Sequence, residues 1–149
     1  QELTGVIENV VEEMRIGAMR KKIKLYYKKA QGEQIYANFD FDKICQVIIN
    51  LIDNSMKFTP GGGEIIINSW QEDSRVFVEV ADNGSGIPHK LLPVVFEKFQ
   101  QVPGSYLKEN RGTGLGLFIV KSLVDLHGGD INIESEVGKG TKVTFSVPT

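Results

Sequence analysis

Three glycines at alternate positions lead directly into an apolar helical pattern, in the segment Arg111-Gly112-Thr113-Gly114-Leu115-Gly116-Leu117. Glycine lets a backbone approach a ligand closely, and a helix start offers unpaired N–H groups and the positive end of a dipole. The segment therefore predicts a loop that opens a helix and binds an anion, with nucleotide phosphates as the best fit. A plain turn before a helix is the alternative interpretation.

A second motif, Asp82-Asn83-Gly84-Ser85-Gly86-Ile87, follows an alternating strand pattern of valines at 76, 78 and 80. An aspartate at the end of a strand can be placed in a pocket with glycine backbone beside it. Its carboxylate only accepts hydrogen bonds, which suits an exocyclic amine such as that of adenine. The alternative is a surface turn, because Asp-Asn-Gly is strong turn chemistry.

A third motif lies on a predicted helix that carries apolar residues at 44, 47, 48, 51 and 52. At about 100° per residue, Asn50, Asn54 and Lys57 fall within an arc of about 60° beside this apolar stripe. Amide oxygens are hard ligands suited to Mg²⁺, and lysine suits phosphate as a point charge. A solvated helix face is the alternative for this segment taken alone.

In this order, the three segments resemble the G2, G1 and N boxes of the catalytic ATP-binding domain of bacterial sensor histidine kinases, read from the C-terminal side. Phe96-Glu97-Lys98-Phe99 resembles the F box of that family, and Gly138-Lys139-Gly140-Thr141 resembles its last glycine motif. The resemblance covers nearly all 149 residues. It implies a Bergerat-type ATP site, shared more distantly with gyrase, the mismatch-repair ATPases and the large heat-shock chaperone.

The resemblance also implies roles for single residues, with ATP and Mg²⁺ as the bound groups. Asp82 is expected to accept the adenine amino hydrogen and Asn54 to bind Mg²⁺, while Asn50 supports the metal or the phosphates and Lys57 contacts phosphate. The other expected nucleotide contacts belong to the glycine motifs and their neighbours: Gly84, Gly86, Ile87, Arg111, Gly112, Thr113, Gly114, Leu115, Gly116 and Thr141.

Periodicity predicts a single domain over residues 1–149, built as a two-layer α/β sandwich. About three helices are expected to cover one face of a mixed, mostly antiparallel sheet. The first two helices are predicted over residues 4–18 and 43–58, the latter capped by Asp42. The third follows the glycine run, and residues 100–110 are interpreted as a mobile lid. Strands are predicted over residues 23–28, 35–39, 65–70, 76–81, 131–135 and 142–147.

Composition excludes several classes of protein. A net charge of −2 and a pI near 5.7 argue against a nucleic-acid surface. The sequence has no run of 18 apolar residues, so we expect no membrane contact by this segment and a cytoplasmic location. Anchoring of the parent protein in the inner membrane is compatible with this expectation. The chain lacks an initial Met, and we interpret it as a piece of a longer protein. Its expected partners are its own dimerisation and histidine-acceptor hairpin domain, missing upstream, and a response regulator.

The predicted function is to bind Mg-ATP and donate the γ-phosphate to a histidine of that separate acceptor domain. Neither His89 nor His127 lies in the acceptor motif, and His127 is expected in a last helical turn, where the dipole favours a cation. One alternative is an ATP-hydrolysing module of the gyrase or chaperone type. These place a water-activating glutamate where this chain has Asn50, and an amide is no general base. The other alternative is a nucleotide-binding anti-sigma or pseudokinase regulatory module, against which the intact Asn54, Asp82 and F box argue.

Overall fold

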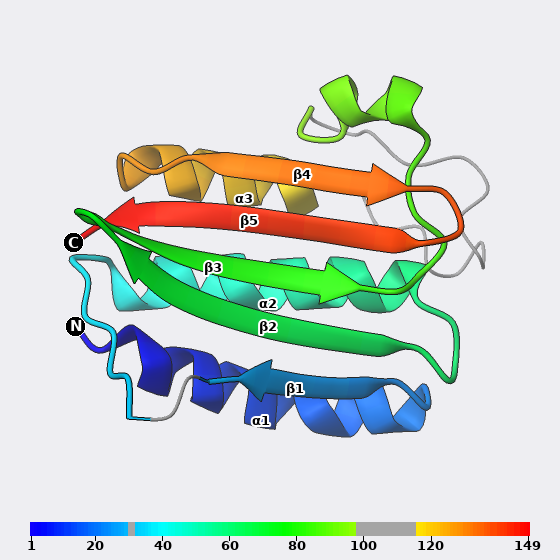
Figure 1. The fold of residues 1–149 in the computed structure, drawn as a ribbon, viewed down its shortest axis with the longest axis horizontal. Helices are drawn as coiled ribbons and strands as arrows, with labels where there is room; N and C mark the ends of the chain where they lie inside the picture. Colours follow the sequence, from blue (N-terminus) through cyan, green and yellow to red (C-terminus); the bar gives the residue numbers. More distant parts are fainter. Residues whose placement is uncertain (30–31, 98–115) are drawn as a thin grey trace.

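The computed structural model describes residues 1–29, 32–97 and 116–149. Its strands form one five-stranded sheet in the order β1-β2-β3-β5-β4, and the three α-helices lie together behind that sheet (Figure 1). Within the described ranges, no helix covers the opposite face of the sheet (Figure 1). The helices are α1 (Leu3–Arg20), α2 (Phe41–Phe58) and α3 (Gly116–Leu126), with a short 3-10 helix η1 (His89–Val94). The strands are β1 (Lys24–Lys28), β2 (Glu64–Glu72), β3 (Arg75–Asp82), β4 (Ile131–Glu136) and β5 (Gly140–Pro148).

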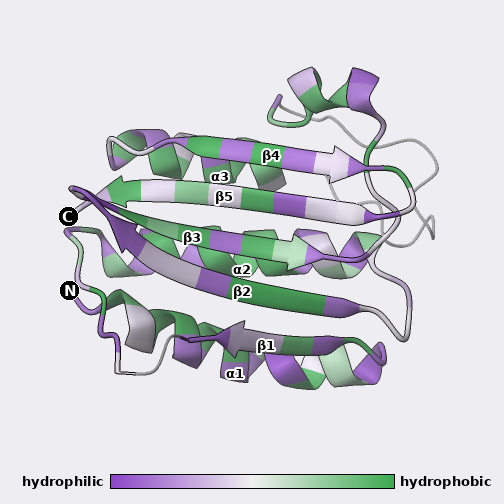
Figure 2. Cartoon of the chain, in the orientation of Figure 1, coloured by the Kyte–Doolittle hydropathy of each residue, from purple (hydrophilic) through white to green (hydrophobic). Residues whose placement is uncertain are grey.

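The sheet is mixed and mostly antiparallel, as the sequence predicts. Only β1 and β2 run parallel, and the pairs β2–β3, β3–β5 and β4–β5 are antiparallel. Side chains alternate between the two faces of a strand, so the buried positions of β3 are every second residue. Figure 2 shows this alternation as green and purple bands along the strands. The two-layer sandwich therefore follows from period-two patterning against helices with one apolar side.

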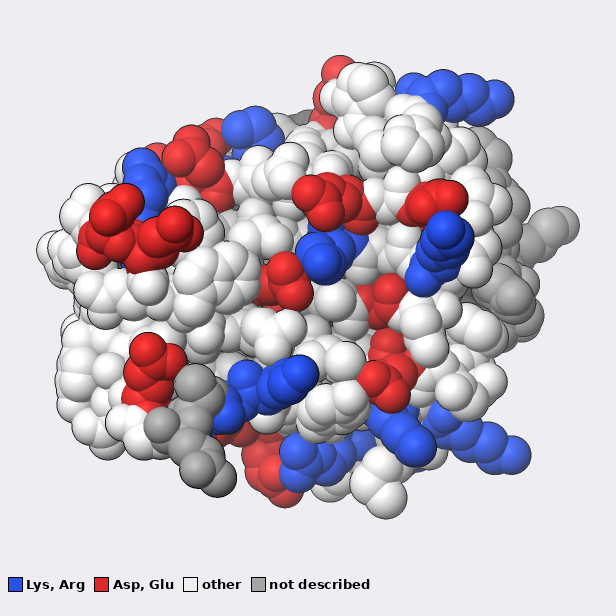
Figure 3. Space-filling model, viewed as in Figure 1, with Lys and Arg blue, Asp and Glu red and all other residues white. Residues whose placement is uncertain are grey.

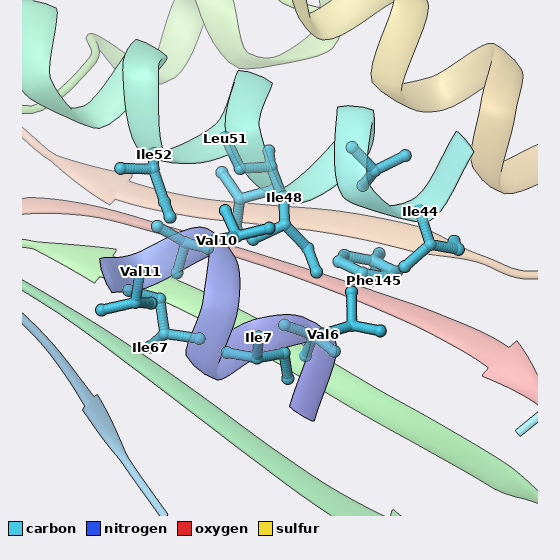
Figure 4. Packing of buried hydrophobic residues seen from close by; sticks show 14 of the residues in the cluster. Val6, Ile7, Val10, Val11, Ile44, Ile48, Leu51, Ile52, Ile67 and Phe145 are labelled. Carbon is cyan, nitrogen blue, oxygen red and sulfur yellow. The ribbon is translucent and has the colours of Figure 1, made fainter. Parts of the chain in front are cut away.

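The core lies between the sheet and the helices. Ile44, Ile48 and Leu51 of α2 are almost fully buried and face the α1 residues and Phe145 of β5 (Figure 4). Complete burial of a side chain of this size stabilises the fold by about 1.5–3 kcal/mol. α2 is therefore packed against the sheet along its whole length. This packing fixes the orientation of the polar side of the helix. Among the described residues, no helix is long and apolar enough to cross a bilayer.

The start of α2 differs from the prediction by two residues. The Asp40 side chain accepts a hydrogen bond from the Lys43 amide at 3.1 Å, so Asp40 caps the helix in place of Asp42. His127 also ties this start to the end of α3. Its Nε2 accepts from the Asp40 amide at 3.1 Å, so its Nδ1, 2.7 Å from the Leu123 carbonyl oxygen, carries the hydrogen. Both ring nitrogens thus have backbone partners, and the ring links the start of α2 to the end of α3.

The predicted strand over residues 35–39 is not part of the sheet. This segment makes only an isolated bridge between Tyr36 and Glu2, while Ile35 and Ala37 bond to the start of the chain. Ile35, Ala37 and Phe39 are nevertheless buried. Their alternation therefore reflects a segment packed along the N-terminus of α1, which the period-two pattern does not distinguish from a strand.

One end of the sheet positions the candidate site. The end of β3, the start of β5 and the end of β4 meet there, and the C-terminal end of α2 lies behind them (Figure 1). The chain termini lie at the other end of the molecule (Figure 1). The ladder places Asp82 opposite Thr141, and Thr141 opposite Ser135. Three polar side chains thus form one row across the helix-facing side of β3, β5 and β4, whose other residues on that side are apolar.

Candidate functional site

Asp82 is the central group of the site. It is the last residue of β3, and its carboxylate lies on the same face as the buried Val76, Val78 and Val80. Its Oδ1 accepts from the amides of Gly84 at 2.9 Å and of Thr141 at 3.3 Å. The strand pattern and the Asp-Asn-Gly turn therefore act together, because the turn brings the Gly84 amide back to the carboxylate.

Burial raises the pKa of the Asp82 carboxyl above its ordinary value. The Gly84 amide, the Ser55 hydroxyl and the Thr141 amide each donate to the carboxylate and oppose this rise. A carboxylate offers about four acceptor positions, so protein donors leave room for one more hydrogen bond. An ionised Asp82 held in this way presents a fixed acceptor to a ligand that donates.

Ser55 is a site residue that the motif analysis did not identify. It is only 5% exposed and lies on the buried side of α2, one turn after Leu51. A hydroxyl in that position needs a hydrogen-bond partner, and Asp82 supplies it. The signal was present in the sequence, because a serine interrupts an otherwise apolar helix stripe.

The glycines of the second motif meet the protein's own backbone. A Cβ on Gly84 would lie 2.3 Å from the Phe58 carbonyl oxygen, and one on Gly86 would lie 2.1 Å from that of Glu136. Gly140 has φ +122, and a Cβ there would lie 2.0 Å from the Asp82 carbonyl oxygen. The glycines therefore allow the loop after β3 to pack closely between the end of α2 and the β4–β5 hairpin. The closeness of Gly84 and Gly86 to a base remains a prediction.

The polar edge of α2 is as expected from its spacing. Asn50, Asn54 and Lys57 are all partly buried. Neither side-chain amide of Asn50 and Asn54 has a hydrogen-bond partner within the described ranges of the chain. Amide oxygens of this kind suit a hard cation. Lys57 pairs with Asp53 at 3.5 Å across one helical turn, and Asp53 is the more exposed of the two. In the described residues, no group of three or more His, Cys, Asp or Glu side chains could hold a metal.

Ile87 and Thr141 join this site to β4. The Ile87 amide donates to the Ser135 Oγ at 2.7 Å, and the Thr141 Oγ1 lies 2.8 Å from the same oxygen. The Ile87 side chain is 1% exposed and is enclosed by protein. Its contact with a nucleotide stays a prediction, whereas its amide is already bonded within the protein.

Part of the predicted site lies outside the described residues. This applies to the lid over residues 100–110, to Phe99, and to the phosphate-binding residues Arg111, Gly112, Thr113, Gly114 and Leu115. Gly116 is described and is the first residue of α3. A Cβ added to Gly116 would meet nothing within 4 Å, in contrast to Gly84 and Gly86. Packing of the described chain thus places no demand for glycine there.

The fold is that of the catalytic domains of histidine kinases. The catalytic domain of histidine kinase ThkA matches with a TM-score of 0.84 and 29% identity, over 99% of this chain and 94% of that one. A mycobacterial sensor histidine kinase, MprB, matches with a TM-score of 0.81 and 26% identity, over 99% of this chain and 96% of that one.

The chain belongs to the family of histidine kinase-, DNA gyrase B-, and HSP90-like ATPases, whose model matches residues 39–149. ATP is accordingly the ligand of this domain. Among curated relatives, the circadian input-output histidine kinase CikA of Thermosynechococcus vestitus is 42% identical over 109 residues, which is 73% of this chain. The sensor histidine kinase WalK of Bacillus subtilis is 39% identical over 125 residues, or 83% of this chain. The aligned regions amount to only 15% and 20% of the lengths of these two relatives.

Proposed function

We propose that this domain binds Mg-ATP and donates the γ-phosphate to a histidine on a separate dimerisation and acceptor domain, in two-component signal transduction. The observation that carries the proposal is the buried carboxylate of Asp82, which three protein donors hold with one acceptor position left. A donor edge such as the adenine amino group fits this position.

The reaction itself needs positioning and neutralisation of charge. Bound ATP supplies the phosphoryl group, and Mg²⁺ neutralises charge on its phosphates. In this chain, Asn54 is proposed to hold the metal, Asn50 to support it, and Lys57 to contact phosphate after release from its exposed partner Asp53. The side-chain amides of Asn50 and Asn54 have no hydrogen-bond partner among the described residues, and the apolar stripe holds their helix in place, which supports this assignment.

The hydrolytic alternative lacks its base. A water-activating group needs a titratable oxygen within reach of the phosphate, and the amide of Asn50 cannot accept a proton at neutral pH. The relatives that the chain resembles are kinases, which favours transfer to a histidine. A response regulator as the downstream partner and a cytoplasmic location belong to the same proposal.

Calorimetry with ADP and Mg²⁺ tests the adenine site. Asp82→Asn replaces one acceptor oxygen by a donor amide, and a mismatched buried pair costs about 1–3 kcal/mol, so ADP affinity falls by roughly 5- to 150-fold. Glu79→Gln is a matched control, because Glu79 lies on the same strand but bonds to Asn68 at 3.2 Å on the open face. Unchanged ADP affinity in Asp82→Asn would contradict the proposed site.

A further inference from the structure

Ser135 is a buried hydroxyl at the centre of three contacts, and the proposed function gives it no task. It is 9% exposed and occupies the helix-facing row of the sheet, where β4 otherwise carries Ile131 and Ile133. Its Oγ lies 2.7 Å from the Ile87 amide nitrogen, 3.0 Å from the Gly140 carbonyl oxygen and 2.8 Å from the Thr141 Oγ1.

These three contacts fix the hydrogens of two hydroxyl groups. Ser135 must accept from the Ile87 amide, and it has one hydrogen of its own to donate. If that hydrogen went to Thr141, the carbonyl oxygen of Gly140 would face a bare oxygen at 3.0 Å. All three contacts are satisfied only when Ser135 donates to Gly140 and the Thr141 hydroxyl donates to Ser135.

The consequence concerns the side of Thr141 that faces the site. With its single hydrogen given to Ser135, the Thr141 hydroxyl offers only lone pairs in other directions. Thr141 stands directly opposite Asp82 in the ladder, and its amide donates to the Asp82 carboxylate at 3.3 Å. Two acceptors, one charged and one neutral, are therefore neighbours at the end of the sheet.

We propose that Ser135 is a positioning residue for base selectivity: it orients the Thr141 hydroxyl as an acceptor beside Asp82, so that the site takes a base edge that donates. The exocyclic nitrogen of a 6-amino purine carries two hydrogens, whereas the exocyclic oxygen of a 6-oxo purine carries only lone pairs at that position. The inference rests on the proposed binding of the base at Asp82. It adds to that proposal a specific source of discrimination against 6-oxo purines.

Ser135→Ala is the first test, with ADP and inosine diphosphate as paired probes in calorimetry. Without Ser135, the Thr141 hydroxyl can rotate and donate, so the ratio of ADP to inosine diphosphate affinity falls, by roughly 3- to 10-fold for one hydrogen bond. Ser135→Thr keeps the hydroxyl and should restore the ratio. Thr141→Val acts from the other side of the same bond and should lower the ratio while the Ile87–Ser135 bond remains.

Ser146→Ala is the matched control. Ser146 is a buried serine at the far end of β5, 3% exposed, and its Oγ bonds to Arg75 at 2.9 Å and to the Asp130 amide at 3.3 Å. It should lose a similar amount of thermal stability and keep the wild-type nucleotide ratio. A merely structural Ser135 would behave in the same way as Ser146.

The outcomes separate the two proposals. If Asp82→Asn loses ADP affinity while folded Ser135→Ala and Thr141→Val both keep the wild-type ratio, the positioning role of Ser135 is wrong and the adenine site stands. If Asp82→Asn binds ADP as the wild type does, the adenine site is wrong and the inference falls with it. A lowered ratio in both Ser135→Ala and Thr141→Val, with an unchanged ratio in Ser146→Ala, supports the inference.

Discussion

At the scale of single residues, Asp82 combines two opposed demands. Burial disfavours its charge and raises its pKa, while three donors from β5, α2 and the loop after β3 stabilise that charge. The net direction is upward, so the folded protein keeps a charged acceptor at a cost in stability. Such a cost is typical of binding sites, where a group is held in readiness for its ligand.

This balance predicts a pH dependence. A carboxyl whose pKa is raised by folding holds its proton in the folded state at pH values where the unfolded chain has lost it. Its contribution to stability is therefore lost as pH rises from the ordinary aspartate value, 3.8, through the raised value, and stays constant above it. Urea unfolding at a series of pH values should show Asp82→Asn gaining stability relative to the wild type across that window. A difference between the two proteins that is independent of pH would contradict the raised pKa.

The residues of the site were predictable to different degrees. Asp82 and Thr141 stand in motifs, and the strand alternation places both on the buried face. Ser55 and Ser135 stand in no motif that we used, but each is a polar residue at an apolar position of a helix or strand. Such an interruption indicates that a partner exists and does not say which, because the partner comes from a distant element.

At the scale of elements, the end of α2 is followed by a buried hydroxyl group without a hydrogen-bond partner, close to the site. Thr59 follows the helix in an extended conformation and is 6% exposed. Its Oγ1 is the one buried side-chain oxygen or nitrogen without a hydrogen-bond partner in the part of the chain that the structure describes. A buried hydroxyl without a partner costs about 1–3 kcal/mol relative to an apolar group of the same shape.

Thr59→Val should therefore stabilise the protein, by about 1 kcal/mol, since valine has the same branched shape and suits an extended backbone. Thermal or urea unfolding measures the change. Thr4→Val is the control, because the Thr4 hydroxyl is equally buried but donates to Glu2 at 2.5 Å, so this substitution should destabilise. If both substitutions shift the unfolding midpoint downward, the unpaired state of Thr59 is refuted.

The helices and strands were more predictable than the neighbours that each of them has in the fold. The helix α2 followed from its apolar spacing to within two residues at its start, because a helix stripe is local information. The strand predicted over residues 35–39 was wrong, because an alternating pattern indicates burial on one side and carries no information about hydrogen-bonded neighbours. The sheet order, in which β5 lies between β3 and β4, is a long-range result that no local pattern contains.

At the scale of the whole molecule, the two faces of the sheet differ in kind. On β3, β4 and β5 the helix-facing side is apolar except for the row at Asp82, while the open face carries interspersed acidic and basic side chains (Figure 3). On that face, Glu79 lies 3.9 Å from Lys142. The polar row on the buried side of these three strands thus lies at one end of the sheet, beside the polar edge of α2.

This arrangement predicts what the isolated chain can do. It contains a proposed donor site but no predicted acceptor, since His127 is bonded between α2 and α3 and His89 begins η1. We expect the chain alone to show no self-phosphorylation with γ-labelled ATP, and slow hydrolysis at most. Adding the separate dimerisation and acceptor domain proposed above should give label on a histidine there, stable in base and lost in acid. Label on His89 or His127 would show that the division of roles is wrong.

The same assay tests the metal assignment on α2. Asn54→Ala removes the proposed Mg²⁺ ligand and leaves the Asp82 pocket, so transfer should be abolished while much of the metal-independent ADP binding remains. Asn132→Ala is the control, because Asn132 is an exposed asparagine on β4 that alternates away from the helices. Its transfer should equal that of the wild type. Normal transfer by Asn54→Ala would show that Asn54 is not the metal ligand. Asn50 would then be the first candidate, because it lies one helical turn earlier and its amide points to the same side of α2.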